Sequence, residues 1–446
     1  MNNYSNTDKG SFIRFLLPSL LGIFLFMIPI VVDGELTIPI AVMASFLQTA
    51  AADYLPLAAT IFIIIAFFGS VIVKITGSKH PFIKSLFDVS LGWLAVRFFG
   101  SVFAVLVLLQ IGPEWLISPD TGGLLLLDLI PLLITVFLFA GFFLPLLLNF
   151  GLLELCGAVL NPVMRPLFTL PGRSSIDSAA SWMGDGTIGV LLTNQQYEQG
   201  YYSKREAAVI GTTFSIVSIT FSIVILSEMN LMQYVLPYYG TILIAGFIAA
   251  IIMPRIPPLS RKKDTYYNSQ EQRHSQPKPS HLNPFQWGIL EASKKAAQNK
   301  ASSIITGGIK NVLDMWIGVL PVVMALGTTA VVVAETTPFF EMIGLPFVPL
   351  LQMLQVPEAA EASQTMLIGF ADMFLPAIIG SGIESELTRF VIAALSVTQL
   401  IYMSEVGGLL LASKLPVSFV DLVVIFLERT IITLPVIIGC AHLIFS

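Results

Sequence analysis

The sequence predicts an all-α polytopic membrane protein that contains an inverted repeat with re-entrant or broken helices. Its composition is too apolar for a water-facing surface, its apolar runs are long, and its basic residues recur on alternate sides of those runs. Of the 446 residues, 55% are hydrophobic and 11% are charged, and the mean hydropathy is +0.83. Soluble domains carry about 25% charged residues, so we expect lipid to cover much of the surface.

Long apolar runs are the candidates for membrane-spanning helices, because a helix needs roughly 20 apolar residues to cross a bilayer. Continuous runs of this length favour helices over barrel strands, since each helix satisfies its own backbone hydrogen bonds in lipid. The candidate spans are 12–32, 55–73, 87–111, 124–148, 207–227, 235–253, 313–334, 388–404 and 419–444. Two shorter, broken apolar runs lie between them, at 175–193 and 364–382.

Basic residues lie in alternate connections between the first spans, and the intervening connections carry Asp and Glu without Lys or Arg. By the positive-inside rule, the N-terminus and the long polar loop 254–300 are expected to be cytoplasmic in a multi-pass protein of the inner (cell) membrane. The basic residues concerned are Lys9 and Arg14 beside the first span, Lys74, Lys79 and Lys84 after the second, and Arg165 and Arg173 after the fourth.

The run 175–193 is flanked by basic residues on both sides, at Arg165 and Lys204, so both of its ends are expected inside. We therefore expect a re-entrant hairpin or a broken helix pair there. The second half repeats the order of elements from the opposite side of the membrane, which is typical of secondary transporters. A chance self-match of apolar helices is the alternative.

Four segments follow from this pattern. Residues 1–120 are expected to form N-terminal transmembrane helices, 121–253 a first repeat, 254–300 a cytoplasmic loop, and 301–446 a second, inverted repeat.

Three motifs carry a family resemblance: Trp182–Gly186, Gln195–Ala208 and Phe214–Ser218. With them, the stretch from about 135 to 230 resembles the nucleoside-recognition (Gate) domain, and more closely its YjiH-like branch. This domain is shared with concentrative nucleoside transporters and with the membrane part of a ferrous-iron transport protein. The resemblance implies membrane transport with hairpins and broken helices around a central site, and it makes the two repeats Gate-like. It does not fix the substrate.

Broken helices expose backbone groups at mid-membrane, where ions or substrate can bind them, so the substrate-binding candidates lie around the breaks. A plain loop at the interface is the alternative for the glycine-rich breaks, and close helix packing is the alternative for the serines. The candidates are Gly184, Asp185, Gly186, Thr187, Asn194, Gln195, Glu198, Ser215, Ser218, Ser381, Glu384, Ser396 and Gln399.

Intramembrane carboxylates are costly and are therefore functional candidates. We expect Asp185, Asp372 and Glu405 to couple transport to an ion. Glu428 and Arg429, within the last span, are expected to be a structural pair that serves other buried groups.

The sequence lacks the G-x-x-x-x-G-K-[ST], H-E-x-x-H and G-x-S-x-G motifs, and its His residues are not near an acidic cluster. We therefore do not expect the protein to be an enzyme, to hold a metal site or to bind nucleic acid. The only cofactor that we expect is a coupling Na⁺ or H⁺. The predicted function is ion- or proton-coupled secondary transport of a small polar solute, either nucleoside-like or zwitterionic like an amino acid or dipeptide. A homo-oligomer would be ordinary for this class. The alternative is a non-transporting scaffold or partner subunit, with 254–300 as its docking segment.

Overall fold

The computed structural model describes residues 9–28, 30–32, 35–77, 80–183, 186–214, 219–269, 282–299 and 302–445. Within these ranges the regular secondary structure is helical apart from a small hairpin of β1 (Ile30–Val32) and β2 (Glu35–Thr37). Seven helical segments of the described chain are long and apolar enough to span a membrane, which confirms an all-α multi-pass fold. They are Gly10–Met27, Leu55–Thr76, Leu91–Leu109, Glu114–Leu148, Met232–Arg261, Ile304–Thr336 and Phe419–Ile444.

The N-terminal helices have the surface that lipid requires. On α3, the side chains of Ile61, Phe68 and Ile72 are exposed, whereas Ile63 and Ala66 are buried against the rest of the molecule. Large apolar side chains on an outer face indicate contact with hydrocarbon rather than water. The helices of this part are α1 (Lys9–Met27), α2 (Pro39–Ala50), α3 (Leu55–Thr76), α4 (Pro81–Phe87), α5 (Leu91–Leu109) and α6 (Glu114–Ile117).

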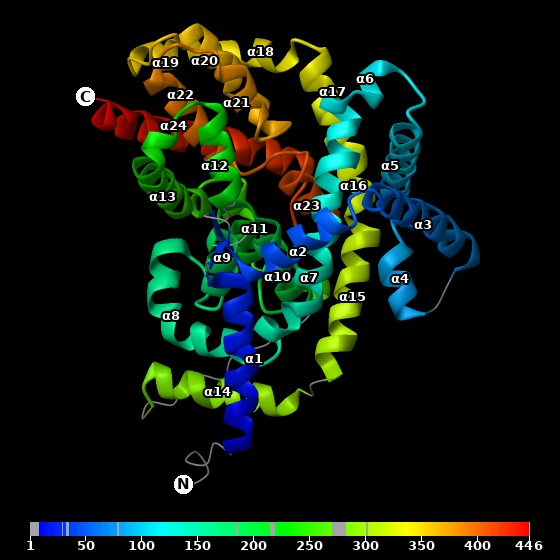
Figure 1. Cartoon of the computed structure of the whole chain (residues 1–446). Helices are drawn as coiled ribbons and strands as arrows, with labels where there is room; N and C mark the ends of the chain where they lie inside the picture. Colours follow the sequence, from blue (N-terminus) through cyan, green and yellow to red (C-terminus); the bar gives the residue numbers. More distant parts are fainter. Residues whose placement is uncertain are drawn as a thin grey trace.

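The next part has one long helix followed by shorter ones that are mostly buried. The π-helical stretch η1 runs directly into α7, and α9 and α10 pack against each other in the centre of the molecule (Figure 1). Ser203 starts α11 with a capping box that includes Glu206. The elements are η1 (Pro119–Leu129), α7 (Ile130–Leu148), α8 (Leu152–Phe168), α9 (Ser174–Met183), α10 (Gly186–Glu198), α11 (Lys204–Thr213) and α12 (Ile219–Glu228).

The connection between the two halves contains more structure than a loop. Its helix α14 packs against α8 and α1 near the N-terminal end of the chain (Figure 1). Lys262 forms an ion pair with Asp421 at 2.7 Å, and the Lys204 N–H donates to the Thr265 carbonyl at 2.8 Å. The connection follows the spanning helix of η2 (Met232–Tyr234) and α13 (Val235–Ile252), and its elements are η3 (Met253–Arg255), η4 (Leu259–Arg261), η5 (Tyr267–Ser269) and α14 (Pro284–Gln298).

The second half begins with a long helix, continues through short pieces and ends with a long helix. The first of these runs from Ile304 to Thr336 through α15, α16, η6 and α17. The elements are α15 (Ser302–Gly318), α16 (Leu320–Val322), η6 (Val323–Gly327), α17 (Thr328–Thr336), α18 (Phe339–Gly344), η7 (Leu345–Phe347), α19 (Val348–Met353), α20 (Ala359–Thr365), η8 (Ile368–Phe370), α21 (Leu375–Gly380), α22 (Glu386–Gln399), α23 (Val406–Ala412) and α24 (Phe419–Ile444).

Several expected spans are wrong in their bounds or continuity. The first span ends at Met27, before β1, and 207–227 is divided between α11 and α12. The expected span 388–404 ends at Gln399, because Leu400 has a positive φ of 69° that a helix cannot accommodate. The broken run 364–382 contains α20, η8 and α21, and the run 175–193 contains α9 and α10.

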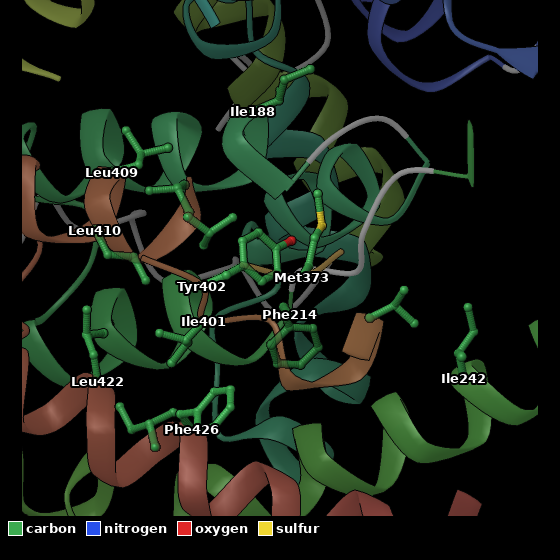
Figure 2. Packing of buried hydrophobic residues seen from close by; sticks show 14 of the residues in the cluster. Ile188, Phe214, Ile242, Met373, Ile401, Tyr402, Leu409, Leu410, Leu422 and Phe426 are labelled. Atoms are coloured by element: carbon green, nitrogen blue, oxygen red, sulfur yellow. The ribbon is translucent and has the colours of Figure 1, made fainter. Parts of the chain in front are cut away.

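One large cluster of buried apolar side chains joins the two halves of the chain. It includes Phe214 after α11, Met373 before α21, and Tyr402 after α22. Figure 2 shows these three with Ile401 and Phe426, so the ends of several short helices meet in the same core. Close packing of this kind holds irregular backbone in place where no regular ladder can do so.

Candidate functional site

A polar cavity of about 210 Å³ lies between α5, α10, α15 and α23. Its apolar wall includes Trp93, Leu191 and Met315, and its polar groups come from three separate parts of the chain. The polar lining residues include Asn194, Gln195, Glu198, Asn311, Asp314 and Lys414. Ligand sites typically have this composition, with a mainly apolar enclosure and a few convergent polar groups.

The C-terminal end of α10 provides the first polar group of the cavity. The Asn194 side-chain amide donates to Glu198 Oε1 at 2.8 Å, across one helical turn. The Asn194 Oδ1 accepts the Lys414 backbone N–H at 2.8 Å. Asn194 thus connects α10 to the segment that follows α23, and it orients the Glu198 carboxylate at the same time.

The cavity contains charges of both signs. Burial raises the pKa of the Glu198 carboxyl, and the Asp314 carboxylate adds to this increase; the Asn194 amide, Lys414 and Lys310 lower the pKa. The Lys414 side chain is exposed at the cavity, while Glu198 and Asp314 are half-buried. Two carboxylates and an ammonium group around amides can bind a solute that carries both donors and acceptors.

The wall formed by α5 is held by a buried arginine. Arg97 is 4% exposed and donates to Ser70 Oγ at 2.5 Å, to the Leu86 carbonyl at 3.1 Å and to the Ala66 carbonyl at 3.3 Å. These bonds attach α5 to α3 and α4. Across the cavity, the Asn311 amide donates to the Gly141 carbonyl at 3.2 Å and so attaches α15 to α7.

A buried polar network next to the cavity joins α9 to α10. Gln196 donates to Asp177 Oδ1 at 2.6 Å, and Thr193 Oγ1 donates to Asp177 Oδ2 at 3.1 Å. Arg173 Nε donates to Gln196 Oε1 at 2.7 Å and pairs with Glu154 at 3.7 Å. Because buried polar groups are costly to leave unpaired, this network fixes how α10 presents its cavity-facing side chains.

The structure brings three of the expected site residues together at the cavity. Asn194, Gln195 and Glu198 line the cavity. Gly186 and Thr187 are buried at the start of α10 and are not among the lining residues. Gly184, Asp185, Ser215 and Ser218 lie outside the described residues.

The expected second-half residues lie away from this cavity. Ser381 Oγ donates to the Ile378 carbonyl at 2.9 Å, and the Glu384 N–H donates to Glu358 Oε2 at 3.1 Å in an exposed loop. Ser396 Oγ donates to the Ala393 carbonyl of its own helix at 2.9 Å. None of these three residues is among those that line the polar cavity.

Gln399, Asp372 and Glu405 belong to a different place, where the short helices of the second half end. Gln399 Nε2 donates to the Met366 carbonyl at 2.6 Å and to Thr430 Oγ1 at 2.9 Å. Asp372 Oδ1 accepts the Phe374 N–H at 2.8 Å. Glu405 is buried directly before α23, whose opposite end lines the cavity.

Sequence reasoning missed Arg97, Asn311, Asp314 and Lys414 as lining residues. A signal was present for two of them, because Arg97 and Asp314 are charged residues within apolar runs and such residues are functional candidates by default. Asn311 and Asp314 are three residues apart and therefore share a helix face.

The fold and the domain content together define a class. Residues 130–232 match the Gate family model, described as nucleoside recognition. Within the chain, this match covers α7 to α12 and therefore includes α10, which carries Asn194, Gln195 and Glu198. A multi-pass helical protein with a Gate domain is a membrane transport protein rather than an enzyme.

A relative establishes the family. The protein named Uncharacterized protein BpOF4_10220, from Alkalihalophilus pseudofirmus, is 51% identical over 442 residues, which cover 97% of this chain and 95% of that protein. The chain therefore belongs to the same family as this protein. Among solved structures, CNTnw in an outward-facing state has a TM-score of 0.45 and 14% identity, covering 98% of this chain and 100% of that chain. A likeness at this level does not by itself establish a shared fold.

Proposed function

We propose that the chain is a secondary transporter of a small polar solute, coupled to an ion or a proton, and that the cavity between α10, α15 and α23 is its solute site. The observation that carries this proposal is the composition of the cavity. Its walls come from the N-terminal helices, the Gate domain and the second half of the chain, and the polar groups include Glu198, Asp314 and Lys414. Transport by one half moving against the other requires a site of this kind between them.

The polar groups suit two solute classes. A zwitterion such as an amino acid or dipeptide would place its ammonium group near Glu198 and Asp314 and its carboxylate near Lys414. A nucleoside-like solute would use the carboxylates as acceptors for hydroxyl groups and the amides of Asn194, Gln195 and Asn311 for the base. The description of the Gate family favours the second class.

The basic residues indicate the side of the membrane to which the cavity would open. If the connections that contain Lys204 and Lys262 are cytoplasmic, then the end of α10 that carries Glu198 lies near the cytoplasmic side. The cavity would then open to the inside of the cell. For the coupling ion, Asp185, Asp372 and Glu405 remain the proposed residues, because each would bring a carboxylate to an interrupted helix.

We favour a transporter over a scaffold because the described parts of the segment 254–300 are attached to the folded body. Lys262 pairs with Asp421, Thr265 accepts from Lys204, and α14 packs against α8 and α1. A free docking segment would not be held in this way. Deletion of 270–281 should leave solute flux intact in a transporter, whereas loss of a bound partner protein on deletion would favour the scaffold.

The test is solute uptake into proteoliposomes under an imposed sodium or proton gradient, with uridine, leucine and a dipeptide as labelled solutes. We expect uptake of one solute class above that of empty vesicles. Asp314→Asn and Glu198→Gln should each lower that uptake at least tenfold, if each loses about 1.4 kcal/mol or more of solute binding. Glu341→Gln, an exposed carboxylate outside the cavity, is the matched control and should keep the wild-type rate.

Uptake equal to that of empty vesicles, for every solute that stabilises the purified protein, would end the transporter proposal. Asp372→Asn tests the coupling residue separately, because it should remove the dependence on the gradient while solute binding remains.

A further inference from the structure

Arg429 lies near the middle of α24 and is 1% exposed. Its guanidinium donates to two backbone carbonyls. Nε and Nη2 both reach the Thr398 carbonyl, at 3.0 and 2.8 Å, and Nη1 reaches the Thr213 carbonyl at 3.0 Å. One buried side chain therefore connects segments from the two halves of the chain, which are far apart in sequence.

Both carbonyls lie in the last turn of a helix. Thr213 is the last residue of α11, and Thr398 is the last but one of α22. The final carbonyls of a helix have no partner within that helix and carry the negative end of its dipole. Neither helix simply continues, since α11 gives way at Phe214 and α22 at Leu400. Two interrupted helices thus direct their negative ends toward the same guanidinium.

Among the described residues, backbone carbonyls balance the positive charge of the Arg429 guanidinium. No ion pair within the described ranges involves Arg429. The adjacent Glu428 does not pair with it; Glu428 lines a surface hollow together with Arg261 and Lys262. Of the expected structural pair, Arg429 therefore bonds to other buried groups, whereas Glu428 lies at a surface hollow. Apolar side chains of the central core, including Phe426, lie around the helix ends (Figure 2).

We propose that Arg429 is a tethered cation that occupies, between α11 and α22, a site where a transported or coupling cation would otherwise bind. In secondary transporters, the C-terminal ends of half-helices and unwound carbonyls are the groups that hold a sodium ion at mid-membrane. Here the same kind of oxygen atoms, from Thr213 and Thr398, binds a guanidinium that cannot leave. Its planar donor set reaches two carbonyls at once, which the point charge of lysine cannot do in the same geometry.

The consequence is that this site contributes no exchangeable cation to coupling and that the ends of α11 and α22 stay joined. The inference about the cation stands on Arg429 and its two carbonyls alone; only its meaning for coupling rests on the proposed transport function. Any ion coupling would have to use other groups, such as the proposed carboxylates.

The test is cation rescue of thermal stability in the purified protein, without any solute. Arg429→Ala should lower Tm by roughly 5 °C or more, since two buried carbonyls lose their donors. Millimolar methylguanidinium or sodium should restore part of this loss in a saturable way, while choline at the same ionic strength should not. The wild-type Tm should not respond to methylguanidinium at the same concentration, and any sodium response of wild type, which the proposed coupling carboxylates would give, is subtracted from that of the variant.

Arg255→Ala is the matched control. Arg255 also donates to the last carbonyls of a helix, those of Pro166 and Leu167 in α8, but it is exposed. Water can replace its donors, so no cation should rescue this variant. A wild-type Tm in Arg429→Ala, or a lowered Tm that no cation restores, would overturn the proposal.

If Arg429→Ala does not fold, two milder variants decide the same question. Arg429→Lys keeps the charge with fewer donors, and Arg429→Gln keeps a donor without the charge. A tethered cation predicts that the lysine variant is the more stable of the two. Equal stability, or a more stable glutamine variant, would show that only hydrogen bonding matters and would overturn the proposal. Because solute flux is not measured, this result does not depend on whether the protein transports.

Discussion

Glu198 and Asn194 show how neighbouring side chains set the chemistry of the cavity. The Asn194 amide donates to the Glu198 carboxylate, and Asn194 accepts the Lys414 N–H. Burial and Asp314 raise the pKa of the Glu198 carboxyl, against the effect of Asn194 and the lysines. Glu198 therefore binds a proton more readily in the folded protein than in the unfolded chain.

This raised pKa predicts how stability depends on pH. Glu198 contributes stability below its unfolded pKa, and that contribution is lost as the pH rises through the folded pKa. Glu198→Gln has no proton to lose at this position. We expect the Tm of Glu198→Gln to increase relative to that of wild type as the pH rises from 5 to 8. This range lies above the ordinary Glu pKa of about 4.3.

Thermal unfolding of both proteins at several pH values checks this expectation. Glu341→Gln, with its exposed carboxyl, should follow wild type across the range. A constant Tm difference between Glu198→Gln and wild type would contradict the raised pKa.

The sequence predicted part of the site at the level of residues. Asn194, Gln195 and Glu198 could be selected because a polar cluster at the end of an apolar run is unusual, and all three line the cavity. Asp314 and Arg97 could have been selected by their charge. Lys414 could not, because it enters the cavity only through the tertiary contact of its backbone with Asn194.

At the scale of the elements, some of the helix interruptions can be predicted from the sequence and others cannot. The break between α9 and α10 and the short helices of 364–382 coincide with glycines and prolines, which mark irregular backbone. The end of α22 coincides with neither, since Leu400 takes its positive φ without being glycine. Tertiary hydrogen bonds stabilise it: the Met403 and Ser404 N–H groups donate to the Phe370 and Ala371 carbonyls at 2.8 and 3.0 Å.

The contact between α9 and α10 depends on a single small residue. A Cβ atom added to Gly189 of α10 would lie 2.5 Å from Ser181 Cβ of α9. We expect Gly189→Ala to separate the two helices and to lower the free energy of unfolding by about 1–3 kcal/mol, the usual cost of overpacking. Solute binding should weaken as well, because α10 carries Asn194 and Glu198.

Gly439→Ala in α24 is the matched control, since no atom lies within 4 Å of the added Cβ. In a helix interior this change should stabilise by up to about 1 kcal/mol. Denaturant or thermal unfolding of both variants and of wild type measures these changes in stability. Equal stability of Gly189→Ala and wild type would contradict the tight α9–α10 contact.

At the scale of the whole molecule, the long continuous apolar runs correctly predicted a multi-pass helical protein, because barrel strands would show short alternating segments instead. Within the described residues there are seven continuous spans, fewer than the sequence predicted. Hydropathy alone cannot distinguish a crossing helix from shorter helices buried inside a bundle, such as α11 and α22. The four expected domains and the inverted repeat remain predictions, and the Gate match at 130–232 falls within the expected first repeat.

The cavity depends on the whole chain, because its walls come from the N-terminal helices, the Gate domain and the second half. No single segment contains the site, so it forms only when the whole chain is folded. This arrangement also explains why the sequence predicted one wall of the site and not the others.

The most direct measurement is ligand-induced stabilisation of the purified wild-type protein and of Asp314→Asn, with nucleosides, amino acids and dipeptides as ligands. A solute at about 100 times its Kd should add about 2.7 kcal/mol to the free energy of unfolding. We predict such a shift in wild type and in Glu341→Gln, and its loss in Asp314→Asn. A stabilising solute whose shift is unchanged in Asp314→Asn and in Glu198→Gln would contradict the claim that this cavity is the solute site.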